Sequence, residues 1–324
     1  MSGFSRVGVA VGAIVVAGLL AGPEFMRPSS LYLVSLWAVT AIAAMGLNLT
    51  LGYAGQISLA QGAFVGIGAY TTALLMQAGL HFVPAFVAAG VLCFAIGWVL
   101  GYPALRVQHH YLAFVTLAFT TLVYLVLRNE QWLTNGVYGI SGIQRPVIFG
   151  FSFGKGVSYY YFCLGMLAVF LAAMWWMIRS PWGRAFLVLR ENPLRAQSLG
   201  IDTRRYTLLA FALGSAIGGL AGGLFAPLVQ FLEPNSFNLG YSLSLLLMVI
   251  VGGSGYLFGP LIGALVAIIL PDFLRFTQGY YLLLYAIAVM VLMTFCPQGL
   301  LGMVDRIKRR LALRERDAQA TKTA

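Results

Sequence analysis

Four long stretches of this 324-residue chain contain no Asp, Glu, Lys or Arg, and this absence limits what the chain can fold into. They run from 28 to 105, 107 to 127, 206 to 232 and 276 to 304. Charged residues make up 9% of the sequence and hydrophobic residues 60%, whereas a soluble domain usually carries about 25% charge. The pattern predicts an all-α polytopic membrane protein, with its charges placed between the spans.

Apolar segments of roughly membrane-spanning length follow one another along the chain. We predict about ten transmembrane helices, and expect the eighth and ninth to be weak because glycine and proline interrupt them. The ten are Val7–Ala21, Leu31–Leu51, Gln56–Met76, Phe82–Leu100, Tyr111–Leu127, Tyr159–Ile178, Tyr206–Leu228, Ser242–Val251, Leu257–Leu270 and Tyr280–Phe295. The first could also be a signal peptide, but its basic region is thin and a poor cleavage site follows it.

These spans form one predicted membrane domain at 1–304, and a basic tail follows at 305–324. Five spans precede a polar loop and five follow it, which gives halves at about 1–128 and 158–304. Two consecutive five-span units must face opposite ways, so an inverted repeat is possible. Both halves place a glycine-rich break before a helix of small residues, at 51–70 and 251–266. Paired breaks of this kind indicate a pathway in transporters, although glycines spaced four apart also serve tight helix packing.

The distribution of basic residues favours one orientation. If the stretch at 180–205 faces the cytoplasm, both termini do too, and 15 of the 20 basic residues then lie on that side. This skew agrees with the positive-inside rule. The net charge of +11 is therefore a topology signal, and we expect no nucleic-acid partner.

The stretch Ser180–Arg205 is the one long charged segment within the apolar part of the chain. Asn192 can cap a helix there, Pro193 suits the first helical position, and Gly200 suits the left-handed residue past the end. The helix predicted is Pro193–Leu199, about two turns long and marginal alone in water. It suits a segment on which another protein docks. An ordinary cytoplasmic loop, held in place by its arginines, is the alternative.

Few polar side chains lie within the spans, and most of these gather near the first glycine-rich break. In hydrocarbon each one needs a partner or water, so amides there indicate a helix break that lines a cavity or meets a partner. A threonine in a helix more often bonds its own backbone. The candidates for a translocation pathway are Asn48, Tyr53, Gln56, Ser58, Gln61, Thr116 and Thr120.

Several functional classes are disfavoured by what the sequence lacks. No ionisable side chain is predicted in mid-membrane, where proton-coupled carriers keep one, and this suits a neutral or zwitterionic substrate. No G-x-x-x-x-G-K-[ST] phosphate loop occurs, so any ATP is bound by a separate subunit. We expect no cofactor, no metal site and no enzymatic activity, because the cysteines and histidines lack ligand spacing and no catalytic triad or carboxylate pair appears.

Five segments resemble the branched-chain amino-acid ABC importer permeases of the LivM type, and the likeness runs from about Leu31 to Gly302, nearly the whole chain. They are LNLTLGYAGQISLAQGAFVGIGAY (47–70), TNGVYGISGI (134–143), SPWGRAFLVLRENPLRAQSLGID (180–202), LLLMVIVGGSGYLFGPLIGA (245–264) and CPQGLLG (296–302). One departure is Asn135, where the family commonly has glycine.

The resemblance implies a bacterial inner-membrane permease, surrounded by lipid, that pairs with a second homologous permease. Two cytoplasmic ATPase subunits and a periplasmic substrate-binding protein would complete the importer. It also implies that 180–205 is the loop that couples to the ATPase, in which Ala196 and Gly200 keep the family pattern while its leading glutamate is absent. The coupling residues implied are Gly183, Arg184, Arg190, Glu191, Asn192, Pro193, Arg195, Ala196, Leu199 and Gly200.

The substrate stays open at this point. The family also includes transporters for urea, short amides and aromatic acids. The uncharged spans alone would also allow a self-sufficient channel or carrier for a small neutral solute, although the capped helix in the charged stretch would then have no explanation.

Overall fold

The computed structural model of the chain describes residues 22–24, 27–104, 109–148, 151–154, 156–273 and 299–303, with single positions at 18, 287, 290, 294 and 306. Apart from those positions, the predicted spans Val7–Ala21 and Tyr280–Phe295 and the tail at 305–324 lie outside the described residues. The long helices are α2 (Pro28–Leu47), α3 (Gln61–Gln77), α4 (Phe82–Ala104), α5 (His109–Asn129), α7 (Gly156–Arg179), α8 (Pro181–Glu191), α10 (Thr203–Val229), α11 (Leu239–Gly252) and α12 (Gly259–Phe273).

Short elements join these helices. The helical ones are η1 (Gly22–Glu24), η2 (Asn48–Tyr53), α6 (Gln131–Thr134), η3 (Gly136–Tyr138), α9 (Pro193–Ser198) and η4 (Pro234–Phe237). The strands are β1 (Ile140–Ser141), β2 (Val147–Ile148), β3 (Phe151–Ser152) and β4 (Phe231–Leu232). Two antiparallel pairs form, β1 with β4 and β2 with β3.

Five described helices are long and apolar enough to cross a membrane, so the chain is a polytopic helical membrane protein. They are Pro28–Tyr53, Phe82–Pro103, Leu112–Asn129, Gly156–Arg179 and Thr203–Val229. Two shorter apolar helices, α11 and α12, occupy the segments predicted to be weak. The two histidines that precede the predicted span at Tyr111 lie in the first turn of α5.

The predicted third span begins five residues later than its apolar composition indicates, at Gln61 instead of Gln56. Past α2 the chain widens into the π-helix η2, and it then runs without helical structure through 54–60. Gly55 has φ +70°, a left-handed conformation that stops a helix. The glycine-rich break expected here is therefore present, and it leaves α3 with 17 residues.

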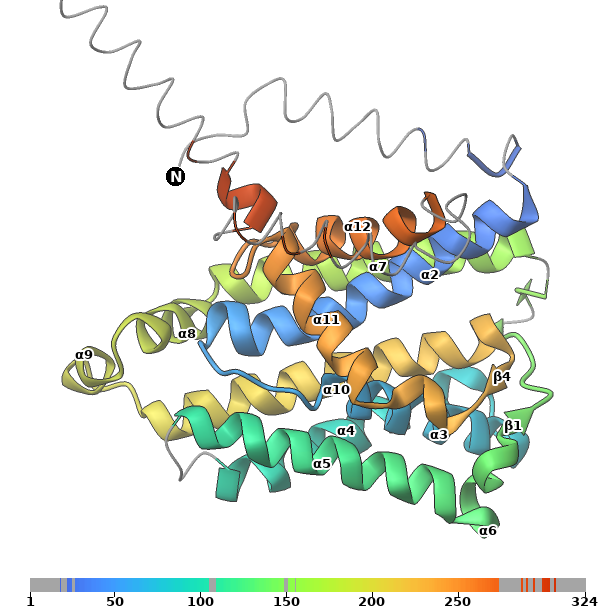
Figure 1. Cartoon of the computed structure of the whole chain (residues 1–324), viewed down its shortest axis with the longest axis horizontal. Coiled ribbons are helices and arrows are strands. Elements are labelled where there is room, and N and C mark those ends of the chain that lie inside the picture. Colours follow the sequence, from blue (N-terminus) through green and yellow to red (C-terminus); the bar gives the residue numbers. More distant parts are fainter. Residues whose placement is uncertain are drawn as a thin grey trace, which may run out of the picture.

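Helix α10 lies at the centre of the bundle and packs against α2, α3 and α4 (Figure 1). Its glycines allow the neighbouring backbones to come close. A Cβ atom added to Gly68 of α3 would collide with the backbone of Gly219, and one added to Gly222 would collide with the backbone carbonyl of Val65. Gly222 is one of the glycines spaced four apart in α10, and the packing role predicted for it is confirmed at this contact, whereas Gly219 lies outside that pattern.

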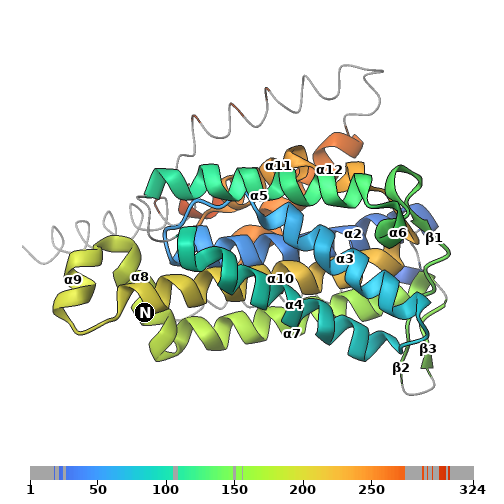
Figure 2. The ribbon, with the colours of Figure 1, turned by 90° about the horizontal axis from the view of Figure 1, so that it is seen from below.

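The two ends of the bundle carry different structures. The charged helices α8 and α9 project at one end, whereas α6, β1 and β4 lie at the other (Figure 1). Figure 2 shows β2 and β3 at that second end as well. The charged stretch and the polar loop therefore lie on opposite sides, as the orientation deduced from the basic residues requires.

We predict that Gly68→Val destabilises the protein by about 2 kcal/mol, because the added methyl groups meet backbone atoms of Gly219 that cannot rotate away. For a chain of this size that loss would lower the melting temperature in detergent by about 3 °C. Gly165→Val in α7 is the matched control, since nothing lies within 4 Å of a Cβ there. Equal melting temperatures for the two variants would contradict the packing role.

Candidate functional site

The capped helix predicted inside the charged stretch is present as α9. Asn192 Oδ1 accepts hydrogen bonds from the backbone N–H groups of Leu194 and Arg195, at 3.0 and 3.1 Å. Pro193 is the first helical residue, and Gly200 has φ +76° just past the end. Only Ala196 of this helix is buried. Leu194 and Leu199 leave 74% and 66% of their surface exposed, so α9 presents apolar side chains to its surroundings.

Helix α8, directly before α9, is the element that the sequence analysis missed. Ser180 caps it by accepting from the N–H of Gly183, and Pro181 is its first residue. Its buried face contains Ala185, Phe186 and Leu189, and the Phe186 ring meets Tyr206 of α10 edge-on with 6.2 Å between centroids. The Ser-Pro start and the apolar residues three and four apart were the available signals. The arginines on the opposite face made this segment resemble a charged loop.

The predicted coupling residues divide into two groups. Gly183 is buried, and a Cβ atom added there would collide with the carbonyl oxygen of Ile178 in α7. Arg184, Glu191 and Arg195 are exposed. Arg190 is exposed too, but its guanidinium donates to the backbone carbonyl of Gly52 in η2.

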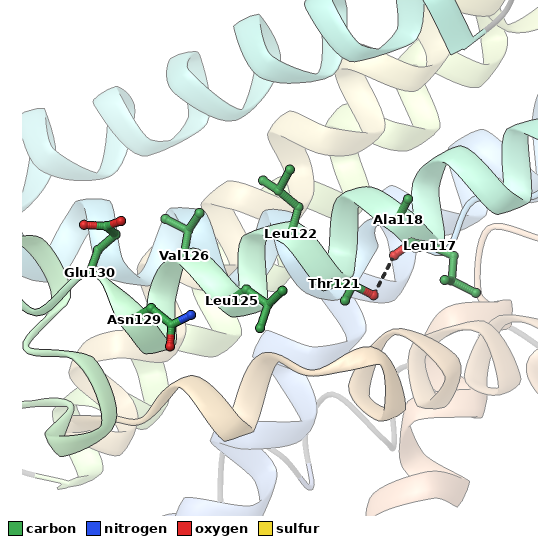
Figure 3. Close-up of a pocket in the computed structure, with 8 residues that line it drawn as sticks. All are labelled: Leu117, Ala118, Thr121, Leu122, Leu125, Val126, Asn129 and Glu130. Carbon is green, nitrogen blue, oxygen red and sulfur yellow. Dashed lines mark hydrogen bonds between the residues drawn. The ribbon is translucent and has the colours of Figure 1, made fainter.

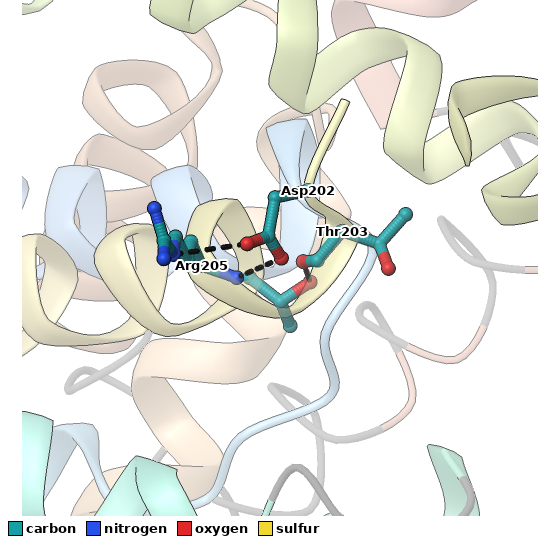
Figure 4. Close-up of polar contacts among 4 residues, drawn as sticks. Asp202, Thr203 and Arg205 are labelled. Atoms are coloured by element: carbon teal, nitrogen blue, oxygen red, sulfur yellow. Dashed lines mark hydrogen bonds and ion pairs between the residues drawn. The ribbon is translucent and has the colours of Figure 1, made fainter. Parts of the chain in front are cut away.

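The remaining arginines of the stretch make local contacts. Arg179 stacks over Trp175 at 3.9 Å from the ring centroid, and Arg204 lies 5.1 Å from the ring of Tyr102. Asp202 caps α10 by accepting from the N–H of Arg205, and its carboxylate also pairs with the Arg205 side chain at 2.9 Å (Figure 4). This ion pair is exposed, and exposed pairs contribute little to stability.

Two threonines of α5 hold the non-helical segment 54–60 in place. Thr116 Oγ1 accepts from the N–H of Leu59 at 3.0 Å, and Thr120 Oγ1 donates to the carbonyl of Leu59 at 2.8 Å. The Thr116 hydroxyl donates to the carbonyl of Ala113 in its own helix, and the single hydrogen of the Thr120 hydroxyl is shared between the carbonyls of Leu59 and Thr116. Because the two residues are one turn apart on the same face, they satisfy both backbone groups of one residue that no helix serves.

Two glutamines, one within this segment and one directly after it, bind it to the neighbouring helices. Gln61 Nε2 donates to the carbonyls of Ala43 in α2 and Gly214 in α10, at 2.9 and 3.2 Å. Gln56 Nε2 donates to the carbonyl of Thr207 at 2.8 Å. Its Oε1 is one of three buried side-chain polar atoms, among the described residues, that have no hydrogen-bond partner. Ser58, also buried, accepts from the N–H of Ala60.

Asn48 joins the two glycine-rich breaks. Its Oδ1 accepts from the N–H of Gly255 at 2.9 Å, and its Nδ2 donates to the carbonyl of Tyr256 at 3.0 Å. Tyr53, at the end of η2, is buried at 4% exposure. The structure thus separates the seven pathway candidates into a group around 54–60 and the pair Asn48 and Tyr53 near the second break. Their role in translocation stays a prediction.

A shallow groove follows the outer face of α5, and all of its lining residues belong to that helix and the residue after it (Figure 3). Its walls are mostly apolar and exposed, and the Thr121 hydroxyl bonds back to Leu117 of the same helix. The lining residues are Leu117, Ala118, Thr121, Leu122, Leu125, Val126, Asn129 and Glu130. Within the described ranges, no group of three metal-ligating side chains comes together.

Comparison with known proteins assigns the chain to a family. Residues 29–296 match the family described as branched-chain amino acid transport system / permease component. The chain belongs to this permease family. It is therefore a permease subunit of an ABC importer by descent, which accounts for the lack of a nucleotide-binding loop in its own sequence.

Similar relatives carry names within this class. The chain is 33% identical over 308 residues to the high-affinity branched-chain amino acid transport system permease protein LivM of Escherichia coli (strain K12), an alignment that covers 88% of this chain and 72% of the relative. It is 26% identical to a probable LivM of Methanocaldococcus jannaschii, over 67% of both chains. It is also 26% identical to the autoinducer 2 import system permease protein LsrC of Escherichia coli (strain SMS-3-5 / SECEC), over 68% of this chain and 64% of the relative. No solved structure matches the chain.

We predict that Thr120→Val releases the segment 54–60. The change keeps the side chain's shape but leaves the partly buried carbonyl of Leu59 without this donor, which costs about 1 kcal/mol. Hydrogen exchange at the amides of 55–60 would rise, and the melting temperature would fall. Thr121→Val is the control, because that exposed hydroxyl bonds only its own helix. If the amides of 55–60 exchange at the same rate in both variants, Thr120 does not hold the segment.

Proposed function

We propose that the chain is one of two paired transmembrane subunits in a bacterial ATP-driven importer for branched-chain or related amino acids. The membership of the permease family and the exposed, capped helix α9 support this most directly. ATP is bound by a separate cytoplasmic subunit, and a periplasmic protein delivers the substrate.

Helix α9 has the properties of a docking element. It extends from one end of the bundle (Figure 1), with the side chains of Leu194 and Leu199 exposed beside Arg195. An isolated helix this short is marginal in water, but here Asn192 caps it and α8 anchors it to α7 and α10. A preformed apolar tip flanked by a cation suits a groove on a partner protein.

This assignment fixes the orientation and the places of the other partners. If α9 meets the ATPase, its end of the bundle is cytoplasmic, both termini share that side, and the membrane is the inner membrane. The opposite end, with α6 and the strand pairs, then faces the periplasmic binding protein. The apolar outer face of α5 is left for lipid or for the second permease subunit.

The described helices also support ten spans and a repeat. Seven helices cross or partly cross the bundle besides α3, and the two predicted spans outside the described residues would complete ten. In each half, a long central helix (α2 or α10) is followed by a segment without α-helix, at 54–60 or 230–238, and then by a shorter helix (α3 or α11). These units run in opposite directions along the bundle (Figure 1), as an inverted repeat requires.

The substrate class rests on two observations. The LivM relatives are named for branched-chain amino acids. The pathway candidates are all uncharged, which suits a zwitterion that carries no net charge across the membrane. The similarity to the LsrC permease shows that the family scaffold is not confined to one substrate.

We predict that Leu194→Asp reduces co-purification of the ATPase subunits with the tagged chain at least tenfold, because a carboxylate would be buried in the partner's apolar groove. Leu133→Asp is the matched control, since Leu133 is an exposed leucine of α6 at the opposite end of the bundle. The folded yield of both variants should equal that of the wild type. Retention of the ATPase by the Leu194 variant would exclude α9 as the contact.

Proteoliposomes test the importer against a self-sufficient channel. We expect no uptake of branched-chain amino acids by the purified chain alone, and ATP-dependent uptake when the second permease, the ATPases and the binding protein are added. Flux through the isolated chain would contradict the proposed function.

A further inference from the structure

Arg190 connects the coupling segment to both glycine-rich breaks. It lies at the C-terminal end of α8, and its Nη1 donates to the carbonyl of Gly52 in η2. Its stem packs against Gly55, where an added Cβ would lie 3.1 Å from the Arg190 Cγ atom. Among the described residues no ion pair involves this guanidinium, so the backbone carbonyl is the partner shown for its charge.

The second break meets the same guanidinium. A Cβ added to Gly255 would lie 2.5 Å from Arg190 Nη1 and 3.0 Å from the carbonyl oxygen of Gly52. A Cβ added to Gly52 would in turn collide with the backbone nitrogen of Gly255. Both glycines are needed for this contact, and Asn48 fixes it by bonding Gly255 and Tyr256.

We propose that Arg190 is a positioning residue that clasps the two breaks together and passes movement of the ATPase-docked segment to them. We call Arg190, Gly52 and Gly255 the clasp. This inference deepens the proposed function and rests on it. It separates the charged stretch into a contact element, α9, and a transmitting element, the end of α8.

The packing of α8 makes such transmission possible. Phe186 is fully buried and meets Tyr206, and Ala185 and Leu189 share its buried face. Arg190 lies on this packed helix two residues before Asn192, the residue that joins α8 to α9, so a displacement of α9 has only this short joint to cross before it reaches Arg190. A planar guanidinium that donates in fixed directions suits this contact better than a flexible ammonium.

Hydrogen exchange on the purified chain tests the clasp without any partner. In Arg190→Ala we expect the amides of 48–56 and of 253–258 to exchange about tenfold faster, the factor expected when a charge-assisted hydrogen bond is lost. Arg190→Lys should restore part of the protection. Arg184→Ala is the matched control, because Arg184 is an exposed arginine of the same helix. The proposal would be wrong if exchange became faster in only one of the two segments, or if it became equally fast in the Arg184→Ala control.

The coupling role is tested in the reconstituted importer. Arg190→Ala should keep its ATPase subunits and continue to hydrolyse ATP, while uptake per ATP hydrolysed falls about tenfold and recovers in part with lysine. Loss of ATPase binding would make Arg190 a docking residue, and unchanged uptake per ATP would remove its transmitting role. If the wild type itself brings down no ATPase, the proposed function fails and transmission fails with it, whereas the exchange result on the clasp stands by itself.

Discussion

The hydrocarbon core of a membrane offers no water to backbone N–H and C=O groups, so every interruption of a helix there needs a partner from within the protein. This chain contains two glycine-rich interruptions, and both are served by side chains distant in sequence. Thr116 and Thr120 satisfy Leu59, Asn48 satisfies Gly255 and Tyr256, and Arg190 satisfies Gly52. The same few polar residues therefore decide where the bundle can be irregular and which elements are joined there.

Much of this organisation could be predicted from the sequence. The charge-free stretches predicted a polytopic helical membrane protein, because a charged side chain is costly to transfer into lipid, and five described helices are long and apolar enough to span a membrane. The cap at Asn192, the proline at 193 and the left-handed Gly200 gave α9 nearly to the residue, since local rules govern a helix end. The polar cluster near the first break was also predicted, because an amide in an apolar run calls for a partner.

What the sequence could not supply was the identity of the partners. Gln61 was a pathway candidate, but its amide bonds the carbonyls of Ala43 and Gly214, and only the packed bundle shows that these lie together. Helix α8 was missed because its arginines resemble a loop until Phe186 and Tyr206 are seen in contact. The late start of α3 follows from the left-handed backbone of Gly55. Glycine permits this conformation, but the sequence alone does not show that Gly55 adopts it.

The two ends of the α11–α12 hairpin are attached by different kinds of bond. Its root follows β4, which pairs with β1 through the backbone, whereas its turn is bonded by the Asn48 side chain, beside the Arg190 guanidinium. Helix α11 has 14 residues, which is an arm of about 21 Å. A tilt of about 5° at the root would carry the turn about 2 Å, enough to break a hydrogen bond. The hairpin is thus held by backbone pairing near the strands, and by side-chain hydrogen bonds at its other end, which a small tilt would break.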